Sequence, residues 1–209
     1  MFNILLALIF LRPFISSLAY PYIDILYSGA LLAFSIIWIG LFKSKAKDFN
    51  LIKTPLIALA AAVIISFISS LDKLTSMIEI YKYIPYALIF YICASLDRIK
   101  IRAVIKILLA AGTCVCVIAL YQYLFGFNRL SAFMDAHKIF SPVARSYIES
   151  KRVFAPFITP NILGGYLAML LPLAFIEKKQ RWFAVPFIIV LLLTKSFGAL
   201  MALSAAIYI

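Results

Sequence analysis

The chain has 209 residues, of which 66% are hydrophobic and only 13% are charged, and its net charge is +12. A soluble domain has about 25% charged residues, so this composition excludes a soluble globular protein and indicates an integral membrane protein. The basic residues gather in connectors between apolar segments, where Lys and Arg orient membrane proteins. The net charge therefore does not indicate binding to nucleic acid.

Eight apolar segments follow one another, several of them shorter than the ~20 residues that a helix needs to cross the hydrocarbon core. Arg12 and Pro13 interrupt the first segment, and proline lacks the amide hydrogen that a continuing helix needs. The sequence therefore predicts an all-α fold, a polytopic integral membrane protein with about eight transmembrane helices. These are expected at residues 2–20, 25–42, 55–71, 76–96, 103–125, 161–176, 182–194 and 197–209.

Three connectors hold more than half of the basic residues, and basic residues in short loops stay on the cytoplasmic side of the membrane. Two expected helices separate each of these connectors from the next, so all three lie on one face. The N-terminus is then predicted to be cytoplasmic. The residues are Lys43, Lys45, Lys47 and Lys53, then Arg98, Lys100, Arg102 and Lys106, and finally Lys178, Lys179 and Arg181.

The connector over residues 126–160 is predicted to lie on the outer side. It is net basic, and it is rich in aromatic residues, which argues against disorder. We expect an outer loop that forms an amphipathic cap at the membrane interface. Its charged residues are Arg129, Lys138, Arg145, Lys151 and Arg152 against Asp135 and Glu149, and its aromatic residues are Phe127, Phe133, Phe140, Tyr147, Phe154 and Phe157.

Arg152 is the sharpest candidate for a binding residue. A guanidinium makes two charge-assisted hydrogen bonds to a phosphate and stays ionised in a partly dry site. Pro160 and Asn161 begin the next expected helix, whose positive end can act on the same anion. The alternative interpretation is that Arg145, Lys151 and Arg152 solvate the loop or contact anionic lipid headgroups.

The remaining polar residues have structural interpretations. Glu79 and Lys82, spaced i and i+3, predict a helical salt bridge, and Arg12 is the only ionisable residue expected well inside a span. Cys114 and Cys116 point to different helix faces. No disulfide or metal site is predicted.

Three segments occur in an order typical of one family. Residues 121–126 read YQYLFG, residues 152–166 read RVFAPFITPNILGGY, and residues 193–199 read LTKSFGA. In this order and on these elements the sequence resembles the O-antigen ligase and polymerase superfamily. That family shows an aromatic-Gln-aromatic pair near a glycine. It then shows an arginine, a Gly-Thr-Phe-like turn, Asn-Pro-Asn and a small residue before an aromatic, and finally Thr-x-Ser-Arg-Gly.

The chain departs from the family pattern at several positions. Ala155 and Pro156 stand where the family favours Gly and Thr, and Thr159 replaces the first Asn. Phe197 occupies the position of the arginine in the third motif, which leaves Lys195 as the cation of that turn. An ammonium is a point charge and does not reproduce the bidentate geometry of a guanidinium.

The resemblance implies transfer of an undecaprenyl diphosphate-linked oligosaccharide to a lipid, glycan or protein acceptor. The reaction would occur at the outer face of the bacterial cytoplasmic membrane, in surface polysaccharide synthesis, without a metal or other cofactor. The implied partners are the lipid-linked glycan donor, a glycan, lipid A-core or protein acceptor, and membrane lipids. The implied diphosphate ligands are Arg152, Arg145 and Lys195, and the loop-to-helix junction is Pro160, Asn161, Gly164 and Gly165.

The resemblance also divides the chain into three parts. Residues 1–125 form N-terminal transmembrane helices, residues 126–160 form the outer basic and aromatic loop, and residues 161–209 open the ligase-like core. Family members carry the proposed base, a histidine, in a later outer loop. His137 lies before that position, so we assign it no catalytic role and expect the chain to be the N-terminal portion of a longer protein.

Two other functions stay open. A membrane transporter of a small anion such as bicarbonate would favour buried charges, broken helices and an internal repeat. Of these the sequence offers Arg12 and the possible breaks at Pro172 and Pro186. A non-catalytic membrane remnant or scaffold would leave the ordered motifs around Arg152 without a role.

Overall fold

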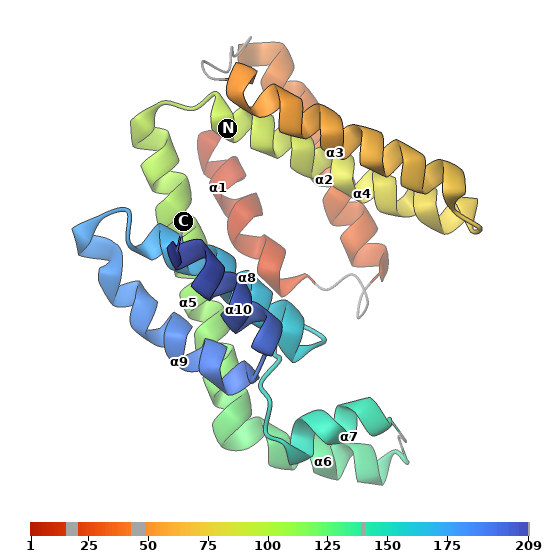
Figure 1. Cartoon of the computed structure of the whole chain (residues 1–209), viewed down its shortest axis with the longest axis vertical. Coiled ribbons are helices and arrows are strands. Elements are labelled where there is room, and N and C mark those ends of the chain that lie inside the picture. Colours follow the sequence, from red (N-terminus) through yellow and green to blue (C-terminus); the bar gives the residue numbers. More distant parts are fainter. Residues whose placement is uncertain (16–20, 43–48, 139–140, 209) are drawn as a thin grey trace. The chain divides into compact units, whose positions relative to one another are not determined.

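A computed structural model describes residues 1–15, 21–42, 49–138 and 141–208, and each regular element in these ranges is a helix (Figure 1). The α-helices are α1 (Phe2–Leu11), α2 (Pro21–Phe42), α3 (Phe49–Ser69), α4 (Lys73–Ala94), α5 (Arg98–Tyr121), α6 (Phe127–Ala136), α7 (Pro142–Glu149), α8 (Pro160–Ala174), α9 (Ala184–Thr194) and α10 (Phe197–Tyr208). Short 3-10 turns form η1 (Arg12–Phe14) and η3 (Lys178–Phe183), and a π-turn forms η2 (Gln122–Gly126).

Every apolar segment of the sequence contains a helix, but only some of these helices are long. Within the described ranges, three stretches are long and apolar enough to cross a membrane: Pro21–Phe42, Lys73–Ala94 and Arg98–Ala136. The apolar helices at Phe2–Phe14, Leu56–Ser69 and Pro160–Ala174 are shorter. The protein is therefore all-helical, with three candidate membrane-spanning helices.

The first expected span is not one continuous helix. α1 ends at Leu11, and Pro13 stands in the first turn of the 3-10 helix that follows. Proline fixes its own backbone angle and donates no amide hydrogen bond, so the α-helix stops before it. The Arg12 guanidinium donates to the Ile15 carbonyl oxygen at 2.8 Å. Residues 16–20 of this expected span, and Lys43, Lys45 and Lys47 of the first basic connector, lie outside the described residues.

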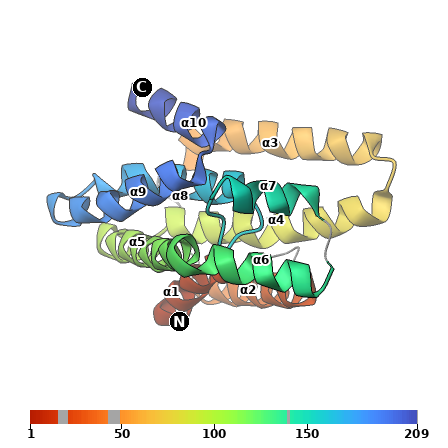
Figure 2. The same ribbon diagram turned by 90° about the horizontal axis from the view of Figure 1, so that it is seen from below.

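The expected long loop is largely helical. The helix that begins at Arg98 does not end at residue 125 but continues through η2 into α6, a stretch of 39 residues in all. α7 follows and packs against α6 (Figure 2). The described residues of this connector that are not helical are His137, Lys138 and Ser141, between α6 and α7, and residues 150–159. Phe140 lies outside the described residues.

The chain divides into two compact units. The first contains Met1–Phe2 and Tyr20–Ala103, and the second contains Asn3–Ala19 and Val104–Ile209. In the first unit α2 packs along α4, and Gly29 lies where an added Cβ would be 3.0 Å from the Tyr81 hydroxyl oxygen.

In the second unit α8 lies beside α9 and α10 (Figure 1, Figure 2). Its core holds the fully buried side chains of Leu109, Leu163 and Phe187. Gly112 on α5 permits this packing, because a Cβ there would be only 2.6 Å from Leu170. This core holds together the helix ends that carry the candidate site.

Candidate functional site

Arg152 is positioned by the C-terminus of α7. α7 ends at Glu149 with Ser150 as its C-cap, and Lys151 adopts the left-handed conformation with φ 49°. The Lys151 amide then donates to the Ile148 carbonyl at 3.0 Å, and the Arg152 amide donates to the Tyr147 carbonyl at 2.9 Å. This is the Schellman arrangement, here with lysine in place of the usual glycine. It turns the chain so that Arg152 leaves the helix axis.

Neutral groups hold the Arg152 side chain. Its Nε donates to the Thr194 carbonyl oxygen at 2.9 Å, and one terminal nitrogen, Nη2, donates to Oδ1 of Asn161 at 3.0 Å. The guanidinium also lies over the Tyr147 ring, 5.4 Å from its centroid, a cation–π geometry. Of the five N–H donors of a guanidinium, three make no hydrogen bond with the described residues. No carboxylate in the described ranges forms an ion pair with it.

Lys195 lies in the same group of contacts. It caps α9 in the left-handed conformation with φ 50°, and its Nζ donates to the Ser150 carbonyl oxygen at 2.7 Å. A backbone hydrogen bond of 3.2 Å from the Val153 amide to the Leu193 carbonyl joins the same two segments. The structure therefore brings together Arg152 and Lys195, two cations more than 40 residues apart in the sequence.

Gln122 ties the first motif to the second. It is buried in the π-turn η2, and its Oε1 accepts from the amides of Phe154 at 2.8 Å and Ala155 at 2.9 Å. A π-turn widens the helix and often occurs at functional sites. Here it directs one side-chain oxygen at two backbone donors of an irregular segment. The sequence analysis gave Gln122 no role, although a glutamine within an aromatic run was the available signal.

The junction residues have different local roles. Thr159 caps α8, because its Oγ1 accepts from the Ile162 amide at 3.3 Å, and Pro160 is the first helical residue. An added Cβ at Gly164 would be 2.9 Å from the Ala199 Cβ, so α8 contacts α10 closely at that point. An added Cβ at Gly165 would meet nothing within 4 Å.

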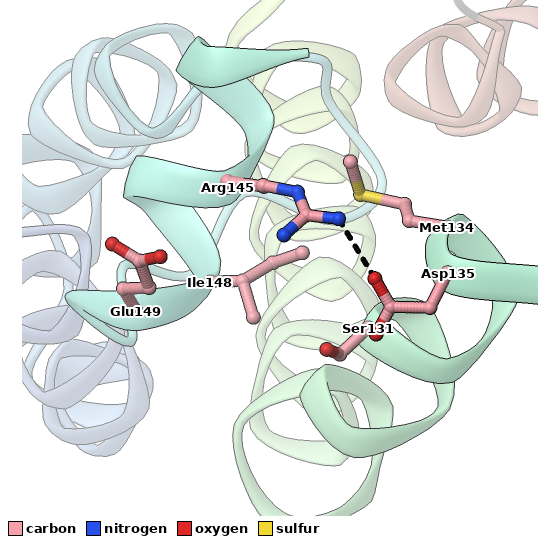
Figure 3. Close-up of a pocket in the computed structure, with 6 residues that line it drawn as sticks. All are labelled: Ser131, Met134, Asp135, Arg145, Ile148 and Glu149. Carbon is pink, nitrogen blue, oxygen red and sulfur yellow. Dashed lines mark hydrogen bonds and ion pairs between the residues drawn. The ribbon is translucent and has the colours of Figure 1, made fainter. Parts of the chain in front are cut away.

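Arg145 has a partner of its own. Its Nη2 donates to Oδ1 of Asp135 at 2.8 Å, which joins α7 to α6 (Figure 3). The pair borders a small pocket of about 50 Å³. The structure therefore places the carboxylate of Asp135 on Arg145, whereas Arg152 and Lys195 meet carbonyl and amide oxygens. The pocket is lined by Ser131, Met134, Asp135, Arg145, Ile148 and Glu149.

His137 makes only local contacts. It is exposed at the end of α6, where its Nδ1 lies 2.9 Å from the Phe133 carbonyl oxygen and its ring packs 4.1 Å from the Phe133 ring. Among the described residues, no group of three or more His, Cys, Asp or Glu side chains is arranged to hold a metal ion.

A second polar cluster lies in the first unit. Asp24, fully buried on α2, is 3.7 Å from Nζ of Lys82, and Glu79 is 2.7 Å from the same nitrogen. The expected salt bridge between Glu79 and Lys82 is confirmed. The expectation that Arg12 is the only ionisable residue well inside a span is wrong, because Lys82 lies midway along the candidate span α4. Asp24 lies in the first turn of α2.

Fold and site together define a membrane-embedded all-helical protein with a cationic group at the junction of its later helices. Comparisons of the chain with protein-family models, curated proteins and solved structures find no significant match. The resemblance of its motifs to the O-antigen ligase and polymerase superfamily stays a hypothesis.

Proposed function

We propose that this protein transfers an undecaprenyl diphosphate-linked oligosaccharide to a lipid, glycan or protein acceptor at the outer face of the bacterial cytoplasmic membrane. The observation that carries the proposal is the meeting of three motifs at one place. Gln122 binds the segment that follows Arg152, Arg152 binds Thr194, and Gly164 packs against Ala199. The three motifs come from segments far apart in the sequence, and their convergence on Arg152 supports one common site.

The charge balance of Arg152 supports an anionic substrate. Its described partners are carbonyl and amide oxygens and an aromatic ring, so its positive charge is oriented but not neutralised. Three of its N–H groups remain for the oxygens of a diphosphate, which a guanidinium binds bidentately. Lys195 adds a second, point-like cation from the neighbouring turn.

In this mechanism the two cations stabilise the departing diphosphate. Negative charge develops on the leaving oxygen as the glycosidic bond breaks, and fixed donors at that position lower the barrier most. A general base must remove the proton of the acceptor hydroxyl. We assign no residue of this chain to that step. Arg145 would contribute less positive charge than Arg152, because Asp135 pairs with it.

The membrane arrangement belongs to the same proposal. About eight helices would cross the cytoplasmic membrane, with the N-terminus inside and residues 126–160 outside. Arg152 would then lie at the outer interface, where the diphosphate of a flipped lipid-linked donor is presented. The basic connector at Lys178 and Lys179, which is exposed, suits the cytoplasmic side.

The test is replacement of Arg152 in the full-length protein. Arg152→Ala removes every donor and should lower glycan transfer about 10²- to 10³-fold, the cost of a lost oxyanion donor. Arg152→Lys keeps the positive charge but loses the bidentate geometry of the guanidinium, and it should retain only a small part of the wild-type transfer activity. The matched control is Arg129→Ala, because Arg129 is exposed and donates to the Tyr121 hydroxyl at 2.8 Å. Normal transfer by both Arg152 variants, with normal membrane insertion, would exclude the diphosphate role.

An anion transporter is the second candidate, and the ion pair between Asp24 and Lys82 favours it. Charged side chains inside candidate spans are expensive and commonly mark ion pathways. The two functions separate by variant. Lys82→Met should abolish bicarbonate uptake by a transporter, whereas Arg152→Ala should leave that uptake unchanged.

A further inference from the structure

An open groove runs between α3 and α4, wholly within the first unit. These helices form a hairpin closed by the three residues 70–72, and they lie side by side (Figure 1). The groove encloses about 760 Å³, within the range of small-molecule sites. Its lining residues recur at three- and four-residue spacing on both helices, so one face of each helix forms one wall.

The groove is polar at one end and apolar along the rest. Ser66, Thr75, Ser76 and Glu79 line the end nearest the hairpin turn, whereas Phe90 lies at the far end of the α4 wall. At 1.5 Å per residue, the stretch from Glu79 to Phe90 is about 16 Å long. One leaflet of the bilayer's hydrocarbon is about 15 Å thick, half of the ~30 Å core. The apolar part therefore has the length of one lipid chain.

Charged and tyrosine side chains mark the level of the interface. Glu79 and Lys82 form their ion pair at the polar end, and Tyr83 and Tyr86 line the next turn of the groove. Tyrosines of this kind gather at the headgroup level of membrane proteins. A lipid chain that starts at Glu79 would thus begin at the interface and end near the middle of the bilayer.

Glu79 selects the headgroup. It is the one charged residue among those that line the groove in the described part of the chain. One of its oxygens, Oε1, accepts from Lys82, and the side chain is about half exposed. The carboxylate therefore keeps acceptor capacity toward the groove, and a primary ammonium is the headgroup that donates to it.

We propose that this groove binds one aminophospholipid of the surrounding membrane. One acyl chain lies between α3 and α4, and the primary ammonium donates to the Glu79 carboxylate. The proposal is independent of the glycan-transfer proposal, because it uses neither Arg152 nor Lys195.

The first experiment closes the groove. Ala62 and Ala87 line opposite walls, and their small side chains leave the space that the chain would fill. Ala62→Trp should remove lipid retained by the full chain, measured by native mass spectrometry after purification in mild detergent and addition of phosphatidylethanolamine. Ala61→Trp is the matched control, because Ala61 is exposed on the same helix but does not line the groove. Retention by Ala62→Trp equal to the wild type would overturn the proposal.

The second experiment tests the headgroup. The wild type should retain phosphatidylethanolamine about tenfold better than phosphatidylglycerol or phosphatidylcholine, since one charge-assisted hydrogen bond is lost with the latter two. Glu79→Gln should abolish this preference and still retain a chain. Equal retention of all three lipids by the wild type would contradict the proposed hydrogen bond from the headgroup ammonium to Glu79. A dimer without lipid would overturn the site, because a second copy would then fill the groove.

Discussion

The two polar clusters of this protein treat charge in opposite ways. In the first unit opposite charges meet on regular helices: the Lys82 ammonium on α4 pairs with the carboxylates of Asp24 on α2 and Glu79 on α4. In the second unit Arg152 stands on an irregular segment and meets carbonyl, amide and aromatic groups, which orient its charge without cancelling it. Charge that is paired within the fold stabilises helix packing, whereas oriented and unneutralised charge suits an anionic ligand.

The largest effect is expected when the ion pair between Asp24 and Lys82 in the first unit is removed. Lys82→Met leaves the Asp24 carboxylate buried beside a thioether, and removal of one partner from a buried ion pair costs about 3–5 kcal/mol. We expect a loss at the low end of this range, because the Lys82 side chain is 18% exposed. Denaturation of the purified protein in lipid bicelles measures the free energy of unfolding.

The matched control for this variant is Lys100→Met. Lys100 pairs with Asp97 at 3.5 Å on the surface, where such a pair contributes about 0–1 kcal/mol. Equal effects of the two substitutions would show that the pair on α2 and α4 is no more important than a surface pair. The double variant Asp24→Asn with Lys82→Met should recover much of the loss, because the buried carboxylate is then neutral.

A smaller effect is expected from closing the helix contact beside Arg152. Gly164→Val puts side-chain atoms where a Cβ alone is 2.9 Å from Ala199, and overpacking of this kind costs about 1–3 kcal/mol. The proposed glycan transfer should fall with stability, since Gly164 also lies close to Thr194, which accepts from Arg152. Thermal unfolding and transfer are measured on the same preparations.

Gly165→Ala is the partner control on the same helix. An added Cβ at Gly165 meets open space, and alanine is favoured over glycine inside a helix by about 0.5–1 kcal/mol. A neutral or slightly stabilising result is expected. Destabilisation equal to that of Gly164→Val would refute the distinction between the two glycines.

Removal of the Gln122 side-chain acceptor should destabilise the protein by no more than Gly164→Val does. Gln122→Leu leaves the Phe154 and Ala155 amides without their acceptor. Since an unsatisfied donor costs about 1–3 kcal/mol when buried and these amides are part-buried, we expect about 1–2 kcal/mol in total. Hydrogen exchange at the two amides should speed up in this variant. Unchanged exchange would show that Gln122 does not hold the segment.

The smallest effect is expected at the cap of α4. Hydrogen bonds from the Thr75 side chain and then its amide lower the pKa of the exposed Asp72 carboxyl. A lowered pKa means that the cap is complete above the ordinary carboxyl pKa and is lost only as pH falls through the lowered value. NMR of the Thr75 amide during an acid titration should show this. Asp72→Asn should abolish the pH dependence, and an unaltered titration would contradict the assignment.

Much of the fold follows from local sequence. Each apolar segment contains a helix, because the residues within it are mostly apolar and favour helix formation. The stop before Pro13 follows from proline's missing amide, and the pair of Glu79 and Lys82 follows from i, i+3 spacing. The helices at Phe127–Ala136 and Pro142–Glu149 were missed, because Gly126 and the mixed charges of this connector are also typical of a loop.

The contact partners of the candidate site residues depended on tertiary structure. The sequence alone indicated a cationic residue before Pro160 and a weak match of three motifs, but it could not show that Arg152 reaches Thr194, that Gln122 holds Phe154, or that Arg145 pairs with Asp135. Hydropathy and the preferences of turn residues depend on residues that are close together in the chain, so they can be predicted from the sequence. Contacts between different elements of the chain, from 10 residues apart for Arg145 and Asp135 to 42 for Arg152 and Thr194, arise only when the helices pack. Only the folded structure therefore distinguished the oriented arginine from the paired one.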